Sequence, residues 1–447
     1  MASVCPLSYR YGSGEMRNLL SRENLLNKMV YVEKAVMRSL EEAGFAPRGC
    51  SEEVEKAGAR VAVEDVDRME RETGHDTASL AILLAEHSGI CGRYVHLGVT
   101  SNDVIDTAWA LVLREALDLL LDRLAKVIAK IASLAREYRD LVCIGRTHGQ
   151  HALPITLGFK FANYVYELAR SYERIVEARK RLVRCKISGA VGTMAAWGEK
   201  GLVVQRTACR ELGLEPHSIT TQIAPRDGYA ELVANLSILA SQLDRLALEI
   251  RELARPEIGE VVIAPKMIGS STMPHKNNPV VAERISGLSR ILRGLAVSAL
   301  ENIVTMHERD LSNSSCERLL LPHTLLVADQ MLIDTEKVLG SIRINREAIK
   351  RNLELLRGVI ASECLMVKLV LKSGMPRHEA HRALSLLVRR SLDERRDFLE
   401  VFRESDLSSK LDSSDAYECF NYENYLGSYR ELIDRALSYA ENVLGKR

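Results

Sequence analysis

The stretch from Asp103 to Asp140 contains neither glycine nor proline, and it follows a plausible helix cap in residues 100–103. At 1.5 Å per residue, a helix of this length would extend roughly 55 Å, far beyond an average helix. Its apolar residues fall on more than one face, so such a helix must be buried on several sides. The stretch therefore predicts one member of a large helical bundle.

Four further segments carry long helical patterns, at residues 155–186, 228–255, 280–306 and about 318–344. Five helices of this kind cannot bury one another fully within one subunit, so we expect subunits to pack together. Shorter helical patterns, broken by glycines, lie on either side of them. The sequence therefore predicts an all-α fold of three helical domains, at residues 1–100, 101–345 and 346–447. An aromatic content of only 5% agrees, because strand-rich domains favour aromatic residues.

Charge and hydropathy argue against nucleic-acid binding and against a membrane protein. The 61 basic and 60 acidic residues leave a formal net charge of +1, so no overall field attracts nucleic acid or an anionic membrane. There is no run of 18 apolar residues, and the N-terminus does not resemble a secretory signal. The basic run at residues 179–186 is interpreted as a solvated helix end. We expect a soluble, cytoplasmic protein that binds neither nucleic acid nor a membrane.

Nine cysteines are many for a cytoplasmic protein, and none forms a C-x-x-C pair. A zinc site or a thioredoxin-like motif is therefore not indicated. Two interpretations stay open, buried free thiols or structural disulfides. Disulfides are found inside cells mainly in hyperthermophiles, and a scarcity of glutamine is typical of proteins from hot environments.

The segment from Pro256 to Pro279 contains four prolines and two glycines, so it cannot be helical. Connections between bundle helices are usually short. A long one that carries adjacent hydroxyls, a lysine and an asparagine indicates a lid over a site.

Within this segment, residues 269–279 read GSSTMPHKNNP, which resembles the signature G-S-S-x-M-P-x-K-x-N-P of the fumarase/aspartase superfamily. Residues 98–103 (GVTSND) and 145–150 (GRTHGQ) match two further superfamily segments in the same order. The resemblance extends over about residues 9–320. It implies helical homotetramers with a twenty-helix core that eliminate or add to fumarate, with each site shared between subunits.

Four segments resemble the adenylosuccinate lyases within that superfamily. They are Arg10-Tyr11 with Glu15-Met16, His75-Asp76, the T-Q-x-x-P-R-D run at 221–227, and the H-E-R-D run with the serines and E-R pair at 307–318. Gly74 stands where many relatives carry arginine. The resemblance implies elimination of fumarate from adenylosuccinate, and from succinylated aminoimidazole carboxamide ribotide, in purine biosynthesis. It implies no metal or organic cofactor.

The resemblance also assigns roles to residues. His148 would be the general acid and Ser270 the general base, whose alkoxide the loop N–H groups and Lys276 would stabilise. Lys276 would also stabilise the carbanion, and Glu283 would orient His148. Residues expected to bind the substrate are Arg10, Tyr11, His75, Asp76, His96, Thr100, Ser101, Gln222, Ser271, Lys276, Asn278, Glu283, Arg309, Ser314 and Arg318.

These residue types suit a substrate with a phosphate and two carboxylates. Arginine offers a planar fork for such groups, and Thr100 and Ser101 lie at a helix start that favours anions. One alternative is a 3-carboxymuconate cycloisomerase, whose loop can also read M-P-H-K-x-N-P and whose substrate has no phosphate. A second is a non-catalytic structural homotetramer, against which the retained His148, Ser270 and Lys276 argue.

Overall fold

The computed structural model describes residues 4–263, 273 and 275–445. Helices dominate it, and the strands among the described residues form three two-stranded sheets. The all-α prediction is confirmed. Ser270 and Ser271 lie outside the described residues.

The five predicted long helices are present. They are α6 (Ser101–Glu137), α7 (Leu157–Leu182), α9 (Asp227–Leu253), α10 (Val280–Glu301) and α11 (Ser312–Leu339). Several of their ends differ from the predicted ones. Helix α10 ends five residues early. Helix α7 begins two residues late, because residues 150–156 form a strand, and it ends four residues early. Helix α11 begins about six residues early and contains Pro322 in its interior.

Contacts divide the chain into two compact units. The first comprises residues up to 125, 171–243 and 285–333, and the second comprises 126–170, 244–284 and 334 onward. This division cuts through the long helices and not between them. The three-domain scheme therefore stays a prediction.

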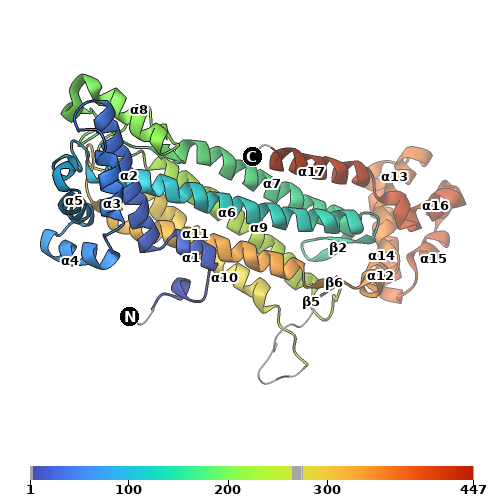
Figure 1. Ribbon diagram of the computed structural model, residues 1–447. Coiled ribbons are helices and arrows are strands. Elements are labelled where there is room, and N and C mark those ends of the chain that lie inside the picture. The colour runs from blue at the N-terminus through green and yellow to red at the C-terminus, as the bar shows by residue number, and fades with distance from the viewer. Residues whose placement is uncertain (1–3, 264–272, 274, 446–447) are drawn as a thin grey trace. The chain divides into compact units, whose positions relative to one another are not determined.

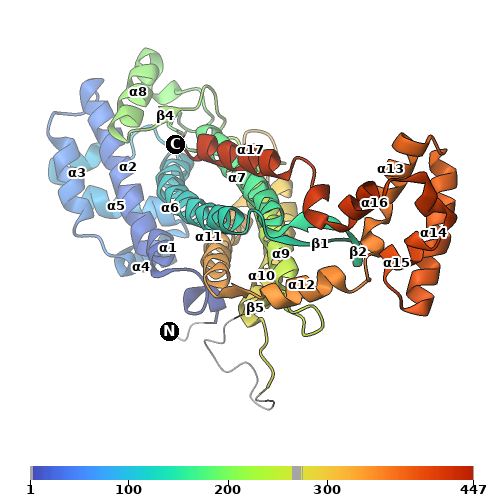
Figure 2. The same cartoon turned by 90° about the vertical axis from the view of Figure 1, so that its right-hand side faces the viewer.

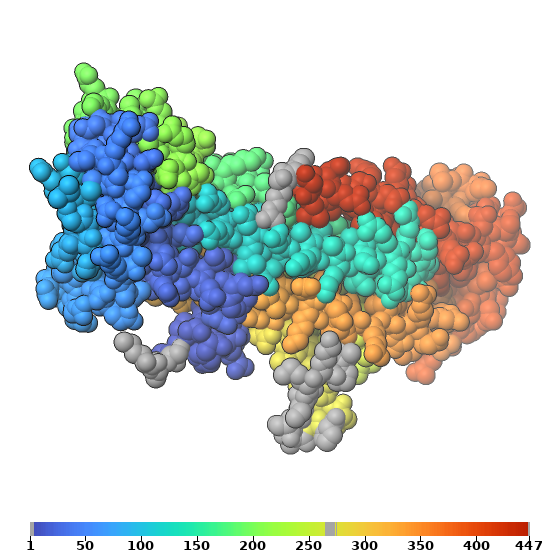
Figure 3. Space-filling view, in the orientation of Figure 1, coloured from blue at the N-terminus to red at the C-terminus, as the bar shows by residue number. Residues whose placement is uncertain are grey.

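In the first unit, α2 packs against α3 and α8, and α5 packs against α3 and α4. Figure 1 shows α2 beside α3, and Figure 3 shows the helices of residues 14–87 as one continuous surface. The core contains fully buried side chains such as Val32, Leu40, Leu80 and Val204. The remaining elements are α1 (Gly14–Leu19), α2 (Arg22–Glu42), α3 (Cys50–Gly58), α4 (Val63–Thr73), α5 (Asp76–His87), α8 (Gly201–Glu211), β3 (Arg184–Cys185), β4 (Glu215–Pro216), and the 3-10 helices η1 (Pro6–Ser8), η2 (Gly89–Tyr94) and η3 (Ala195–Lys200).

The second unit holds an antiparallel hairpin and a cluster of short helices (Figure 2). Leu365, Leu369, Phe398 and Phe402 form its buried core. Strand β5 pairs with β6 just before the segment at 264–272. The elements are β1 (Val142–Thr147), β2 (Gln150–Thr156), β5 (Val261–Ile263), β6 (Ile342–Ile344), α12 (Arg346–Glu354), α13 (Ser362–Ser373), α14 (Arg377–Glu394), α15 (Phe398–Arg403), α16 (Ser413–Phe420), α17 (Tyr429–Leu444), η4 (Val359–Ala361), η5 (Asp406–Lys410) and η6 (Tyr422–Tyr425).

Six of the nine cysteines form disulfides, so the structure decides between the two interpretations left open by the sequence. The pairs are Cys50–Cys91, Cys185–Cys209 and Cys364–Cys419. Cys5, Cys143 and Cys316 are free thiols. Burial raises the pKa of Cys143 to about 12, so this thiol stays protonated and unreactive.

Residues of the basic run form ion pairs within the chain, and the interpretation of the run as a solvated helix end is wrong for Lys186. Arg179 pairs with Asp118, and Arg181 pairs with Glu231. Lys186 lies beyond the end of α7, and its side chain is completely buried. Among the described residues, none of the helices combines the length and apolar character needed to cross a membrane.

Candidate active site

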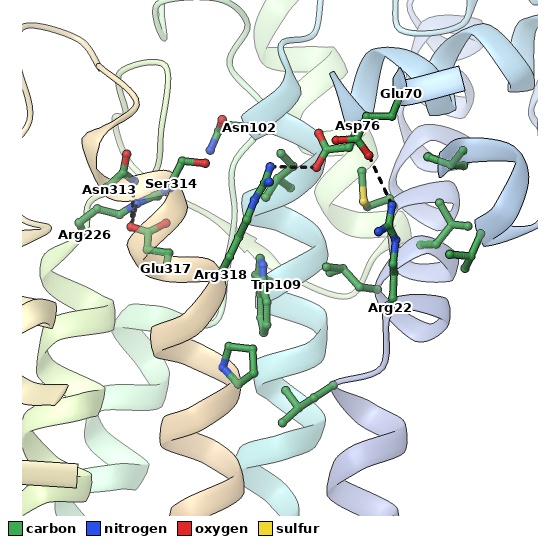
Figure 4. Close-up of a pocket in the computed structure, with 18 of the residues that line it drawn as sticks. Arg22, Glu70, Asp76, Asn102, Trp109, Arg226, Asn313, Ser314, Glu317 and Arg318 are labelled. Atoms are coloured by element: carbon green, nitrogen blue, oxygen red, sulfur yellow. Dashed lines mark hydrogen bonds and ion pairs between the residues drawn. The ribbon is translucent and has the colours of Figure 1, made fainter. Parts of the chain in front are cut away.

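A pocket of about 450 Å³ opens in the first unit between α2, α4, the start of α5, α6 and the start of α11 (Figure 4). Four residues predicted to bind the substrate line it: Asp76, Arg309, Ser314 and Arg318. Apolar side chains of α2, including Leu26 and Met29, form another part of the wall. The pocket therefore combines an apolar wall with arginines and a hydroxyl, a combination typical of sites for amphiphilic anions.

Asp76 is fixed at the start of α5 and faces Arg318 of α11. The Arg318 Nη2 donates to Asp76 Oδ2 at 3.1 Å, a contact visible in Figure 4. His75 is the N-cap of α5, and its Nδ1 accepts a hydrogen bond from the Ala78 N–H at 3.4 Å. Both members of the predicted His-Asp pair thus lie at one helix start, although only Asp76 lines the pocket.

Arg309 and Gln222, which lie far apart in the sequence, contact each other directly. The Arg309 Nη1 donates to Gln222 Oε1 at 3.1 Å. Burial, together with the nearby Arg226, lowers the pKa of Arg309 from its usual value, although it stays cationic. The Arg309 Nε is buried and has no hydrogen-bond partner among the described residues.

A buried charge network lies beneath these residues, and its members were not among the predicted site residues. Arg226 donates to both carboxylate oxygens of Asp106 at 2.9 Å and, through Nε, to Glu317 at 2.8 Å. Burial raises the pKa of Asp106, but the charge of Arg226 outweighs it and the net shift is downward. Burial dominates at Glu317, whose pKa is raised. Both Arg226 and Glu317 lie inside the family-like runs, which was the signal available in the sequence.

The start of α6 is anchored by a second buried pair. The Thr100 N–H donates to Asp103 Oδ2 at 2.7 Å, and Lys186 Nζ donates to Asp103 Oδ1 at 2.6 Å. The Ser188 N–H also donates to that carboxylate at 2.8 Å. Thr100 and Ser101 are therefore held rigidly at a helix N-terminus, where an anion is favoured.

His96 is held by a buried carboxylate. Its backbone adopts a φ of 59°, and its Nδ1 lies 2.6 Å from Glu33 Oε1. Burial lowers the pKa of His96, but the hydrogen bond and the charge of Glu33 outweigh it and the net shift is upward. Near the N-terminus, the Arg10 guanidinium lies 5.9 Å from the centre of the Tyr11 ring.

His148 belongs to the second unit, at the tip of the β1–β2 hairpin. Thr147 pairs with Gln150, so His148 and Gly149 form a two-residue turn. Both have positive φ, 54° and 73°, as a type I′ turn requires. The sequence patterns did not predict this hairpin. The imidazole at this tip is exposed.

The hairpin is held in place near its tip by a bidentate ion pair. Arg146 donates from both Nη atoms to the carboxylate of Glu260, which is only 2% exposed. Asn352 also donates to Glu260 at 2.8 Å. Burial, with help from Arg146, lowers the pKa of His151, which pairs with Arg146 across the hairpin.

Three further predicted residues lie in the second unit. Lys276 and Glu283 are exposed, and Glu283 occupies the first turn of α10. Asn278 is half-buried, and its carbonyl accepts from the Val280 N–H at 2.9 Å. The predicted site residues are thus divided between the two units.

Comparison with known proteins gives consistent results along the whole chain. Residues 9–294 match the family model described as lyase, and residues 358–436 match the one described as adenylosuccinate lyase C-terminus. An adenylosuccinate lyase from Methanothermobacter thermautotrophicus is 44% identical over 99% of this chain and the full length of that protein. One from Pyrococcus abyssi is 43% identical over 99% of each chain.

Solved structures with the same fold include a fumarate lyase from Mesorhizobium sp. BNC1, with a TM-score of 0.87, 32% identity and 98% coverage of each chain. A 3-carboxy-cis,cis-muconate lactonizing enzyme from Pseudomonas putida has a TM-score of 0.88 and 28% identity, and the match covers 98% of this chain and 99% of that one. Identity to the curated relatives is higher, and it extends through the C-terminal helices. The chain therefore belongs to the adenylosuccinate lyase family.

Proposed function

We propose that this protein eliminates fumarate from adenylosuccinate to give AMP, and from succinylated aminoimidazole carboxamide ribotide to give the carboxamide ribotide. The observation that carries the proposal is identity above 40%, over essentially the whole chain, to proteins named adenylosuccinate lyase. The pocket supports it, because Arg309, Ser314 and Arg318 supply the cations and hydroxyl that a phosphate requires. Such a reaction belongs to purine nucleotide biosynthesis, which we place in the cytoplasm.

The muconate alternative is supported less well. The two muconate enzymes among the solved structures are 28% and 25% identical to this chain. Their named substrate has no phosphate, whereas the pocket presents Arg22, Arg309 and Arg318 in addition to the buried Arg226. The full-length relatives therefore favour the nucleotide substrate.

In the proposed reaction, a base removes the proton on the carbon β to the leaving nitrogen, and an acid protonates that nitrogen. We assign the acid to His148, whose exposed imidazole is presented by a rigid hairpin. We assign the base to Ser270, with Lys276 stabilising the alkoxide and the carbanion. Glu283 would orient His148. No metal or organic cofactor takes part.

The substrate would be bound by groups from several elements. The pocket arginines and Ser314 would bind the phosphate. The N-terminus of α6 would bind one carboxylate. The remaining contacts are proposed for Arg10, Tyr11, His75, Asp76, His96, Gln222, Ser271 and Asn278.

We further propose a homotetramer in which neighbouring subunits share each site. Ile291, Val297 and Leu300 on α10 each expose half or more of their surface. Ile291 and Leu300 point to opposite sides of the helix, so exposed apolar side chains occur on more than one face of α10, and such exposure indicates an interface. Light scattering coupled to size-exclusion chromatography measures the assembly directly, and a monomer at micromolar concentration would refute this proposal.

Loss of adenylosuccinate in an ultraviolet absorbance assay tests the function. Ser270→Ala and His148→Ala should each lower kcat by roughly 10²-fold or more, while the enzyme still binds substrate. Turnover of a carboxymuconate in the absence of adenylosuccinate turnover would overturn the proposal.

A complementation assay tests site sharing. The two inactive variants, dissociated and reassembled together, should regain about a quarter of wild-type activity, because random assortment gives about one site in four both wild-type residues. A mixture that stays inactive after verified subunit exchange would place both residues in one chain.

A further inference from the structure

Asn313 is a buried polar side chain in the pocket wall, and none of the roles above uses it. It is the second residue of α11, it is 1% exposed, and it lies beside Glu317 in the pocket wall (Figure 4). A side chain that is both polar and this deeply buried is normally fully hydrogen-bonded.

The orientation of its amide is fixed by its neighbour. The Asn313 Nδ2 donates to Glu317 Oε1 at 2.8 Å, one helical turn further along α11. The same Glu317 Oε1 also accepts from the Arg226 Nε–H at 2.8 Å, so this oxygen acts as an acceptor. The NH₂ group of Asn313 must therefore face it. The carbonyl oxygen is therefore turned away from Glu317.

That oxygen has no hydrogen-bond partner within the described part of the chain. It is buried all the same, and a buried acceptor without a donor is unfavourable. Asn102 presents a second oxygen of this kind in the same pocket, 2% exposed and without a partner among the described residues. Two residues of the pocket wall thus carry buried neutral acceptors that no donor among the described residues satisfies.

We propose that the Asn313 carbonyl oxygen accepts a hydrogen bond from a neutral donor of the nucleoside, either the exocyclic amine of the base or a ribose hydroxyl. This inference rests on the proposed function and adds a determinant of specificity to it. The anionic groups of a nucleotide fit the arginines, but they cannot satisfy an acceptor. A substrate made only of carboxylates on a hydrocarbon frame has no neutral donor at all, so Asn313 would select against it.

The test uses four ligands whose neutral donors differ one at a time: AMP, 2′-deoxy-AMP, 3′-deoxy-AMP and purine riboside 5′-monophosphate, which lacks the amine. Dissociation constants are measured by calorimetry for the wild-type protein and for Asn313→Leu. The wild type should bind one of the three analogues about 10-fold more weakly than AMP. The variant should bind AMP about 10-fold more weakly and should no longer distinguish that analogue from AMP. The identity of the analogue decides between amine and hydroxyl.

Asn163→Leu is the matched control. Asn163 makes the same contact to a glutamate four residues on, at 3.2 Å to Glu167, but it is exposed on α7 and does not line the pocket. The Asn163→Leu variant should bind all four ligands with wild-type dissociation constants.

Two results would overturn the inference. In the first, the wild-type protein binds all four ligands with equal affinity, and this result is obtained without any variant. In the second, Asn313→Leu keeps the preference among the four ligands that the wild type shows. Adenylosuccinate turnover is measured separately. A protein that discriminates among the ligands but does not cleave adenylosuccinate refutes the proposed function and leaves the acceptor role intact.

Discussion

The Cys364–Cys419 disulfide should supply a large part of the stability of the second unit. The two cysteines are 4% and 1% exposed and lie in the core formed with Leu365 and Phe398. The bridge closes a loop with a sequence separation of 55 residues. In the chain-entropy model, a loop of that length contributes about 4 kcal/mol at 25 °C by restricting the unfolded chain.

The double variant Cys364→Ala/Cys419→Ala removes this restriction. The size of the melting-temperature shift depends on how much of the chain unfolds as one cooperative unit. If the second unit of about 200 residues unfolds by itself, the loss lowers the melting temperature by about 10 °C. If all 447 residues unfold together, the shift is about 4 °C. Scanning calorimetry measures the shift.

Cys143→Ala is the control, because it deletes a buried sulfur that is not cross-linked. It should cost only the packing of one small side chain, roughly 1 kcal/mol. If the double variant melts no lower than this control, then the bridge does not stabilise the protein and the entropic argument fails.

Four further predictions concern other parts of the chain. Alkylation under denaturing, non-reducing conditions should modify three thiols, and mass spectrometry showing nine would exclude the disulfides. Lys186→Met should destabilise by about 3–5 kcal/mol in denaturant titrations, because it leaves Asp103 buried without its cation; an unchanged midpoint contradicts this. The raised pKa of His96 means that its pair with Glu33 contributes fully below about pH 6.5 and is lost as the pH rises through the folded-state pKa, so Glu33→Gln should remove this slope from a stability-versus-pH series. Gly98→Ala should cost about 1–3 kcal/mol, because the residue has a φ of +80° and the new Cβ would lie 2.5 Å from the Trp197 Nε1; a wild-type melting temperature would contradict it.

The sequence alone determined the helical character of the protein and the positions of its long helices. The stretch at 103–140 has no glycine or proline, and its apolar residues surround the helix, so local propensity and periodicity agree. The family-like runs also located Asp76, Arg309, Ser314 and Arg318, and the pocket gathers these four. Such information is local, since each run is contiguous in the chain.

Only the tertiary structure decided which distant residues meet. The hairpin that carries His148 was missed because its strands are short, interrupted by Gly145 and Pro154, and placed between two strong helical patterns. The disulfide pairings were equally inaccessible, because spacing along the chain does not set the distance between sulfurs.

The buried charged residues show most clearly that sequence patterns do not reveal contacts between distant residues. Lys186 is the last residue of the basic run and is interpreted from the sequence as solvated, yet it is buried because Asp103, 83 residues earlier, supplies the compensating charge. Arg226 is buried for the same reason, through Asp106 and Glu317. Burial of a charge depends on its partner, and the fold, not the neighbouring sequence, brings that partner into place.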